Sequence, residues 1–418
     1  MYQERLKIDW LVVGLWAALM LFGVMNIYSA TYNADTATLF NFKTYHGKQL
    51  LWMGAAVVTA ILVLFTEPRF FSNTAYPIYG GVLLLLLATL FLAVTVNGGK
   101  SWIEIGGFRF QPTEFAKFAT ALALAKYMSG IGVEWRQSRT KLVALALIAV
   151  PAGLVLLQHD TGSALVFAAF VLPLFREGLS GNILLVGLAA VALFIMALLI
   201  NKYLLIGIIA AVLLLYLFVW LSKRTSATYW RAAGVLVLCA AFVFSVDFVF
   251  NNVLESHQRE RIEVLLGKSE DLQGAGYNVH QSKIAIGSGG LLGKGYLRGT
   301  ITKADFVPEQ HTDFIFCTIG EEWGWMGSTI VVALFVWLLV HLITMAERQR
   351  STFARFYGYS VASILFVHLF VNVGMVLGLL PVIGIPLPFV SYGGSSLLAF
   401  TILLFIFIRQ DAVKNQLL

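Results

Sequence analysis

The chain has 418 residues, of which 59% are hydrophobic and only 12% are charged, and its mean hydropathy is +0.82. Soluble domains carry about 25% charged residues, so this composition excludes an ordinary soluble protein. The formal net charge of +7 does not by itself indicate a nucleic-acid-binding protein, because an excess of Lys and Arg is typical of the cytoplasmic loops of membrane proteins.

Apolar runs of the length that crosses a bilayer, about 20 residues, follow one another along the whole chain. They predict an all-α integral membrane protein, a polytopic helical bundle with about 12 transmembrane helices. We treat 1–418 as a single membrane domain and the amino-terminal run as a retained first span, since no small-residue cleavage site accompanies it. The expected spans are 9–30, 48–66, 74–96, 112–129, 140–158, 161–176, 180–200, 203–222, 229–252, 319–346, 354–378 and 392–409. The span at 161–176 is short, and we expect it to form a tight hairpin with the span before it.

Lys and Arg gather in the loops on the side of the two termini and are sparse in the short loops on the other side. Positive charge marks the cytoplasmic side of a membrane protein, so we expect both termini to be cytoplasmic. This orientation places the polar, glycine-rich stretch 255–318 on the outer face as one large extracytoplasmic loop.

Lys117 is the lysine that lies inside an apolar span rather than in a loop. Its helix opens at Pro112, a residue favoured at the first helical position, and Glu114 lies one turn before Lys117 on the same face. Ionisable groups at membrane depth usually face a partner or a cavity. Two interpretations remain open and are compatible, a structural Glu–Lys pair and a cation that awaits an anionic group.

Three further residues near the same side could line a site. Arg109 precedes the Lys117 helix and is suited to bidentate contact with phosphate. Trp102 fits an interfacial aromatic belt as well as a binding role. Asp160, in the cluster Gln158-His159-Asp160, could cap the next helix or build the site.

The outer loop contains several acids that composition alone cannot rank. Asp271 follows Glu270 in a glycine-rich stretch and could be a general base with a raised pKa. The run 308–313 has one histidine and no second one at ligand spacing, which makes a metal site there the weaker interpretation. Glu321 and Glu322 resemble buried acids that await a cation, for which Lys117 is the expected partner.

The stretch 372–396 contains prolines at 381, 386 and 388 and several glycines, which break a helix. Non-helical backbone at membrane depth is tolerated where it lines a cavity or is buried in protein. We therefore expect a re-entrant segment that lies beside the outer loop.

Five stretches of the chain, in order, resemble the SEDS family (shape, elongation, division and sporulation) of bacterial membrane proteins. They are SWIEIGGFRFQPTEFAK (101–117), QHDTG (158–162), GAGYNVHQSKIAIGSGGLLGKG (274–295), PEQHTDFIF with GEEWG (308–324), and NVGMVLGLLPVIGIPLPFVSYGGSS (372–396). The third stretch and the first part of the fourth lie in the outer loop, and the fifth is the expected re-entrant segment. The resemblance covers most of the chain and is closer to the elongation members than to the division members.

The resemblance implies a peptidoglycan glycosyltransferase that polymerises lipid II on the outer face of the cytoplasmic membrane. It also implies work beside a class B penicillin-binding protein and the elongation machinery, with no nucleic acid involved. The family's essential loop aspartate falls on Asp271. The expected substrate-binding residues are Trp102, Arg109, Glu114, Lys117, Asp160, Gln281, Ser391 and Tyr392.

The chain departs from the family pattern in three places. Leu272 stands where a proline usually follows the loop aspartate, and His159 replaces the proline of the QPD-type motif. The family usually has about ten spans, so we expect an extra pair at 180–222.

The expected reaction is an inverting glycosyl transfer with Asp271 as general base, Lys117 and Arg109 on the diphosphate, and a divalent cation such as Mg²⁺ or Mn²⁺ as a possible cofactor. Two other functions stay open, a lipid II flippase and a non-catalytic scaffold for cell-wall synthases. Polar groups that cluster toward one face favour the enzyme over the flippase.

Overall fold

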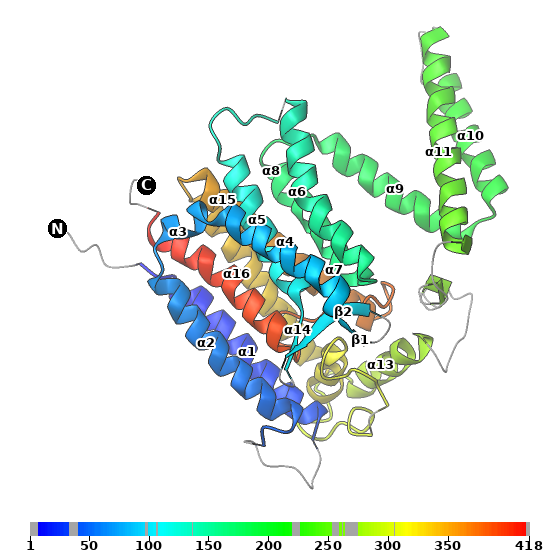
Figure 1. Cartoon of the computed structure of the whole chain (residues 1–418). Helices are drawn as coiled ribbons and strands as arrows, with labels where there is room; N and C mark the ends of the chain where they lie inside the picture. The colour runs from blue at the N-terminus through cyan, green and yellow to red at the C-terminus, as the bar shows by residue number, and fades with distance from the viewer. Residues whose placement is uncertain are drawn as a thin grey trace. The chain divides into compact units, whose positions relative to one another are not determined.

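The computed structural model is predominantly helical and describes residues 7–32, 41–96, 99–105, 108–135, 137–219, 226–252, 259–260, 262–263, 275–304 and 306–414. The predicted all-α polytopic fold is confirmed (Figure 1). The elements are α1 (Trp10–Ala30), α2 (Tyr45–Phe65), α3 (Pro68–Asn73), α4 (Ala75–Leu92), β1 (Val94–Val96), β2 (Gly99–Ile105), β3 (Phe108–Phe110), α5 (Pro112–Met128), α6 (Ser138–Leu157), α7 (Thr161–Val166), η2 (Phe167–Phe170), α8 (Val171–Arg176), α9 (Gly181–Leu199), α10 (Lys202–Val219), α11 (Ser226–Asn252), α13 (Ala275–Gly289), α14 (Ile315–Glu347), α15 (Thr352–Val376) and α16 (Gly394–Ala412).

Within the described ranges, 10 helices are long and apolar enough to cross a membrane. The other two expected spans are also helical but differ in form. α5 has 17 residues, and the stretch 161–176 is divided into α7, the 3₁₀ turn η2 and α8. The expected hairpin is present, because α6 ends at Leu157 and α7 begins at Thr161.

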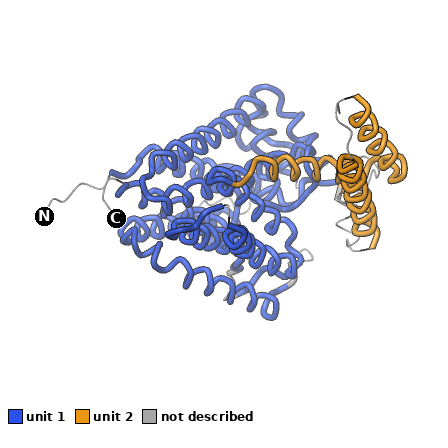
Figure 2. The backbone as a smooth tube through the Cα atoms, turned by 90° about the horizontal axis from the view of Figure 1, so that it is seen from above, with its two compact units in different colours: residues 1–178, 277–418 blue, residues 179–276 orange. Residues whose placement is uncertain are grey.

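The chain divides into two compact units, 1–178 with 277–418 and the intervening 179–276 (Figure 2). The second unit consists of α9, α10 and α11, which pack against one another. An ion pair of 2.8 Å between Lys202 and Asp247 joins the start of α10 to α11. The first unit holds the described residues that were expected to form the site.

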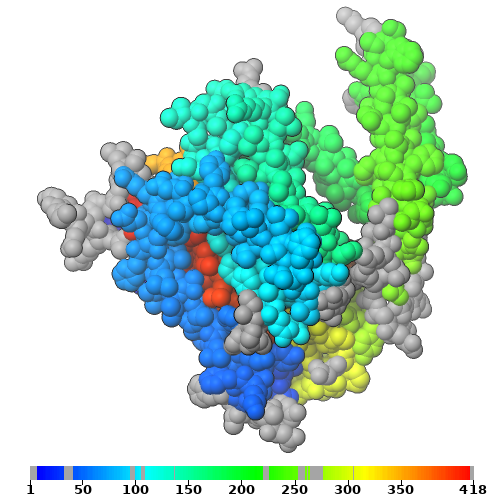
Figure 3. Space-filling view, viewed as in Figure 1, coloured from blue at the N-terminus to red at the C-terminus, as the bar shows by residue number. Residues whose placement is uncertain are grey.

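The core of the first unit forms around α5, α15 and α16, whose side chains are mostly buried. α16 packs against α2 and α5, and α15 packs against α5 and α14. In the space-filling view only a narrow strip of α16, coloured red, shows between α2 and α4 (Figure 3). The helices that surround α5 leave its side chains little contact with the surroundings, so a charged group on α5 must find its partners inside the protein.

The sequence of α5 explains why it can occupy this central place. Proline at 112 opens the helix, and alanines at 116, 119, 121, 123 and 125 are all buried. Small residues let neighbouring helices approach closely in a membrane protein. Glu114 lies in the first turn and Lys126 in the last, which matches the helix dipole.

Three short strands precede α5 and were not predicted. β2 pairs antiparallel with β1 and with β3, so that Glu104 lies opposite Arg109 and Ile103 opposite Phe110. The alternating Trp102-Ile103-Glu104-Ile105 stretch carries the strand signal, but it was interpreted as a loop because it lies between two spans. The sheet fixes the backbone of Arg109 just before α5 begins.

α14 contains a kink at Gly324, whose φ is 65°. A Cβ atom at this position would lie 2.3 Å from the amide nitrogen of Gly293, so only glycine permits the close approach of the two segments. The freed backbone of α14 is used by the loop 290–295, since Trp325 N donates to the carbonyl of Gly290 at 2.9 Å and Gly295 N to that of Glu322 at 2.9 Å. The kink therefore anchors part of the expected outer loop to a long helix.

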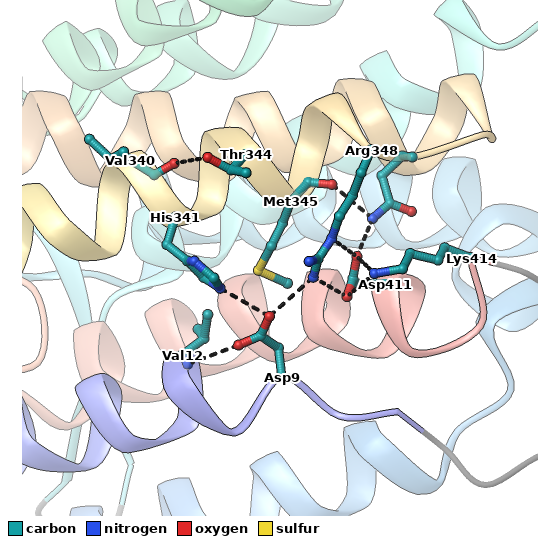
Figure 4. A network of polar contacts seen from close by, with 10 residues as sticks. Asp9, Val12, Val340, His341, Thr344, Met345, Arg348, Asp411 and Lys414 are labelled. Carbon is teal, nitrogen blue, oxygen red and sulfur yellow. Dashed lines mark hydrogen bonds and ion pairs between the residues drawn. The ribbon is translucent and has the colours of Figure 1, made fainter.

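At the opposite end of the bundle, the beginning of α1 and the ends of α14 and α16 meet in a polar network (Figure 4). Asp9 accepts from His341 at 2.9 Å and from Arg348 at 3.1 Å. Arg348 also donates twice to Asp411, at 2.7 and 3.1 Å, and Lys414 pairs with Asp411 at 3.2 Å. Asp9 caps α1 as well, so the network fixes three helix ends together.

Candidate active site

Asp160 connects the turn between α6 and α7 to the start of α5. Its Oδ1 accepts from the backbone N of Ser163 at 3.0 Å, which caps α7. Its Oδ2 accepts from Nε2 of Gln111 at 3.0 Å. The capping role of Asp160 is confirmed, and its part in building a substrate site stays a prediction.

His159 adopts a φ of 61° in the same turn. A proline ring fixes φ near −65°, so the turn in this chain differs from one that a proline at position 159 can form. Gln158 on the other side of the turn is buried, and its Nε2 donates to the carbonyl of Leu86 at 2.9 Å.

Ser395, at the start of α16, ties α16 to β3 and α5. Its Oγ accepts from the backbone N of Gln111 at 3.2 Å and donates to the carbonyl of Arg109 at 3.4 Å. The side chain of Arg109 is exposed, and Tyr392 lies within range of its charge. Arg109 is thus a cation on a fixed backbone that a ligand can reach.

The expected non-helical backbone of the re-entrant segment is confirmed between α15 and α16, with no helix from 377 to 393, while its entry into the membrane stays a prediction. The expected contact with the outer loop is confirmed. Ser391 donates to the carbonyl of Thr312 at 2.7 Å, and Tyr392 N donates to that of His311 at 2.9 Å. The hydroxyl of Ser391 also accepts from Leu387 N at 2.8 Å, so it stabilises the backbone of the re-entrant segment itself.

The rings of Tyr45, His311 and Tyr392 form a cluster from three distant parts of the chain. Tyr45 and His311 lie 4.2 Å apart between centroids, and Tyr45 and Tyr392 lie 5.2 Å apart. Tyr45 is 48% exposed. Half-exposed rings beside the cation of Arg109 give this side of the site a mixed apolar and polar lining.

Lys117 is almost completely buried, with 1% of its side chain exposed. Its Nζ lies 2.7 Å from Oε1 of Glu114, 2.9 Å from Nε2 of His368 and 5.1 Å from the centre of the Phe400 ring. Nδ1 of His368 lies 3.1 Å from the carbonyl oxygen of Pro386. We call these five residues the Lys117 cluster. The predicted Glu–Lys pair is confirmed, while a contact of Lys117 with an anionic ligand stays a prediction.

The expectation that Glu321 or Glu322 pairs with Lys117 is wrong. Glu321 pairs instead with Lys294 at 2.7 Å and accepts from the backbone N atoms of residues 300, 301 and 302. Glu322 accepts from the hydroxyl of Ser29 in α1. The physical reason is local. The kink of α14 places the loop after Gly293 next to these carboxylates, so their partners come from nearby segments and not from Lys117.

The two other expected binding residues, Trp102 and Gln281, lie on different elements of the first unit. Trp102 is half-buried in β2, where its Cα pairs with that of Val94. Gln281 is half-buried in α13, beside Ser282, which is bonded to the carbonyl of Val376 at 2.7 Å. Their part in binding stays a prediction.

Asp271, together with Glu270 and Leu272, lies outside the residues that the structure describes. In the part of the chain that is described, no group of three or more His, Cys, Asp and Glu side chains is arranged to hold a metal ion. The divalent cation therefore stays a prediction, and any carboxylate ligand from this part of the loop has no described geometry.

Sequence reasoning missed His368, Phe400 and Ser395. His368 gave a signal that could have been used, because a histidine inside an apolar span is as unusual as a lysine. Ser395 gave none, since a serine near the start of a helix is common.

A family model described as a cell cycle protein family (FtsW, RodA and SpoVE) matches residues 9–209 and 188–416. The chain is 32% identical over 398 residues to the peptidoglycan glycosyltransferase MrdB of Escherichia coli strain K12, a match that covers 95% of this chain and 91% of that protein. A solved chain from work on the structural coordination of polymerization and crosslinking by a peptidoglycan synthase complex matches with a TM-score of 0.73 at 28% identity, over 99% of this chain and 100% of that one.

The crystal structure of the rod shape determining protein RodA of Thermus thermophilus matches with a TM-score of 0.64 at 26% identity, over 98% of this chain and 99% of that one. The stretch 180–222 forms α9 and α10, and their status as a pair added to the usual helices of the family stays a prediction. The chain belongs to the FtsW/RodA/SpoVE family, the SEDS family of multi-span membrane proteins.

Proposed function

We propose that this protein is a peptidoglycan glycosyltransferase that polymerises lipid II into glycan strands during cell elongation. The observation that carries the proposal is the match over nearly the whole chain to a protein named as a peptidoglycan glycosyltransferase. The polar cluster around Arg109, Asp160 and Tyr392 supports it, because an exposed cation and half-exposed rings on a fixed backbone suit a substrate with both a diphosphate and sugars.

In the proposed reaction one lipid II is the donor and a second is the acceptor. Asp271 takes the proton from the 4-hydroxyl of the acceptor sugar, and the oxygen attacks the anomeric carbon of the donor. The bond from that carbon to the diphosphate breaks, the electron pair leaves with the diphosphate, and the configuration at the carbon inverts. Negative charge grows on the leaving diphosphate, where Arg109 would contact it.

Lys117 is buried in the wall of the proposed site and contributes to the reaction by supporting that wall. Its ammonium is already bonded to Glu114 and His368, so direct contact with the diphosphate requires it to leave one of them. Arg109 is the exposed cation of the pair. We therefore assign phosphate contact to Arg109 first and support of the adjoining wall to Lys117. A divalent cation could add to the stabilisation of the leaving group, and Glu270 is the acid nearest in sequence to the proposed base, Asp271.

We place the protein in the bacterial cytoplasmic membrane, with both termini in the cytoplasm. The excess of Lys and Arg in the loops on the side of the termini supports this orientation. It puts Arg109 and the re-entrant segment at the outer face, where lipid II sugars are accessible. A class B penicillin-binding protein is the proposed partner, since the solved relative comes from a complex that couples polymerization to crosslinking.

The proposal is tested with purified protein in lipid vesicles supplied with lipid II, and glycan chains are separated by length. Asp271→Asn removes the proposed base and should abolish chain growth. Asp247→Asn is the matched control, because Asp247 forms a half-exposed ion pair with Lys202 in the other unit. Equal chain growth in the two variants would remove Asp271 from the role of base.

The two alternative functions predict different results in the same vesicles. A flippase moves lipid II between leaflets, detected with a reagent that labels the outer leaflet only, and makes no glycan. A scaffold does neither, and its Asp271→Asn variant supports cell-wall synthesis as the wild type does. Either result would replace the enzyme assignment.

A further inference from the structure

The buried imidazole of His368 in α15 is a part of the Lys117 cluster that the proposed reaction does not yet use. It is 1% exposed. One ring nitrogen, Nδ1, lies 3.1 Å from the carbonyl oxygen of Pro386, and the other, Nε2, lies 2.9 Å from Nζ of Lys117. Both nitrogens are thus engaged by groups from different segments.

These two contacts define the protonation of the ring. A carbonyl oxygen can only accept, so Nδ1 of His368 carries the hydrogen and donates to Pro386. Nε2 then offers a lone pair in the neutral ring, and the ammonium of Lys117 donates to it. A doubly protonated ring would set two donors against each other at 2.9 Å in a buried place. The result is a directed chain in which Lys117 donates to Glu114 and to His368, and His368 donates to Pro386.

This chain of hydrogen bonds joins three elements that are distant in sequence. Glu114 and Lys117 lie on the first half of α5, His368 lies on α15, and Pro386 lies in the re-entrant segment. The ring of Phe400, from α16, covers a third side of the ammonium and makes an edge contact with His368 at 4.7 Å. The ammonium is therefore held inside the wall of the site by partners on several sides.

We propose that His368 is a positioning residue for glycosyl transfer. It holds the ammonium of Lys117 against the re-entrant segment, and so fixes that segment, which carries Tyr392, relative to the start of α5, which follows Arg109. The inference rests on the proposed function. A misplacement of about 1 Å in such a wall can reduce turnover about 100-fold. Because the substrate contacts themselves remain, we expect the loss in kcat with little change in KM.

Replacing His368 by Gln or by Asn, whose side chains differ in length, tests its bond to Lys117 separately from its bond to Pro386. In His368→Gln the side-chain oxygen can reach the place of Nε2 and accept from Lys117. In His368→Asn the amide reaches only the place of Nδ1 and can keep the bond to Pro386. We expect the Gln variant to retain more than about a tenth of wild-type kcat and the Asn variant about a hundredth. An Asn variant as active as the Gln variant would overturn the inference.

Chemical rescue gives a second measurement that a purely structural role does not predict. His368→Ala leaves a space of the size of an imidazole ring between Lys117 and Pro386. Added imidazole should restore kcat of this variant at least about tenfold, and should restore nothing when Lys117→Met is added. His341→Ala is the control, because His341 lies in the network with Asp9 at the opposite end of the bundle. Absence of rescue in a His368→Ala protein that folds and binds lipid II would contradict the proposal.

Labelling of Lys117 tests the same contact without any reaction on lipid II. A small membrane-permeable amine reagent, followed by mass spectrometry, should leave Lys117 unlabelled in the wild type and in His341→Ala. It should label Lys117 in His368→Ala, and imidazole should protect it again. Protection that persists in His368→Ala would overturn the inference. Failure of the wild type to polymerise lipid II would instead refute the proposed function and leave the labelling result intact.

Discussion

The ion pair between Lys117 and Glu114 makes a quantitative prediction about stability. Both side chains are almost fully buried, with 1% and 2% exposed, and Oε2 of Glu114 has no hydrogen-bond partner among the described residues. In Lys117→Met the carboxylate stays buried without its cation. Removal of one partner of a buried pair costs about 3–5 kcal/mol, because the remaining charge is uncompensated. We expect a loss of this size in the free energy of unfolding.

The double variant Lys117→Met with Glu114→Gln removes both charges and should recover about half or more of that loss. The free energies are measured by unfolding in mixed micelles with increasing denaturing detergent, followed by tryptophan fluorescence. The matched control is Lys202→Met, since the pair of Lys202 with Asp247 has nearly the same length, 2.8 Å, but is 32% and 40% exposed. That control should lose only about 0–1 kcal/mol. A single Lys117→Met loss as small as the control, or a double variant with the sum of both single losses, would refute the reasoning.

Three further predictions concern separate parts of the fold. Gly293→Ala should lower the free energy of unfolding by about 2 kcal/mol or more, because the φ of Gly293 is 79° and a Cβ there would lie 2.1 Å from a carbonyl oxygen of α14. The control for this measurement is Gly287→Ala, whose Cβ meets nothing within 4 Å. Burial of Asp9 favours its neutral form, but the contacts with His341 and the hydrogen bonds from Arg348 and Val12 N together outweigh it and hold the pKa below its usual value. Stability from this carboxylate is therefore present above the unfolded pKa of about 3.9 and is lost as the pH falls through the folded pKa. Ser395→Ala should cost about 0.5–1.5 kcal/mol, since it removes a hydrogen bond to the half-buried N–H of Gln111 at the α5 start, and it should slow polymerisation through the displaced Arg109.

Each of these has a contradicting result. Equal stabilities of the Gly293→Ala and Gly287→Ala proteins would mean that the loop does not press on the kink of α14. Asp9→Asn should flatten the acid side of the stability profile, and a profile identical to the wild type would remove Asp9 from the account. A Ser395→Ala protein with wild-type stability would show that its contact with Arg109 and the α5 start does not hold the segment.

The transmembrane architecture could be predicted from the sequence because apolar length and proline positions act locally. Pro112 opens α5 where expected, and the three prolines after residue 380 keep the re-entrant segment free of helix. Asp160 caps α7 with one carboxylate oxygen, as one of its two predicted roles requires, and its other oxygen accepts from Gln111 at the start of α5. Features of this kind depend on a few residues that are close in sequence, so the sequence alone can predict them.

Features that depend on distant partners could not be predicted in the same way. Glu321 and Glu322 looked like partners for Lys117, but Glu321 pairs with Lys294 in the loop after Gly293, and Glu322 accepts from Ser29. His368 reaches Lys117 across 251 positions of sequence, and no spacing rule connects them. The strands before α5 were missed for a different reason, because the alternation of the seven-residue β2 lies in a connection between two spans and β3 has only three residues.

The most direct test of the central claim is the glycan length distribution made from lipid II by the purified protein in vesicles, with wild type and Asp271→Ala compared at equal amounts. The account predicts long glycan strands from the wild type and none above background from the variant. Strands of equal length and amount from both proteins would contradict the assignment of the base. A wild type that makes no strands, with or without its transpeptidase partner, would contradict the proposed function itself.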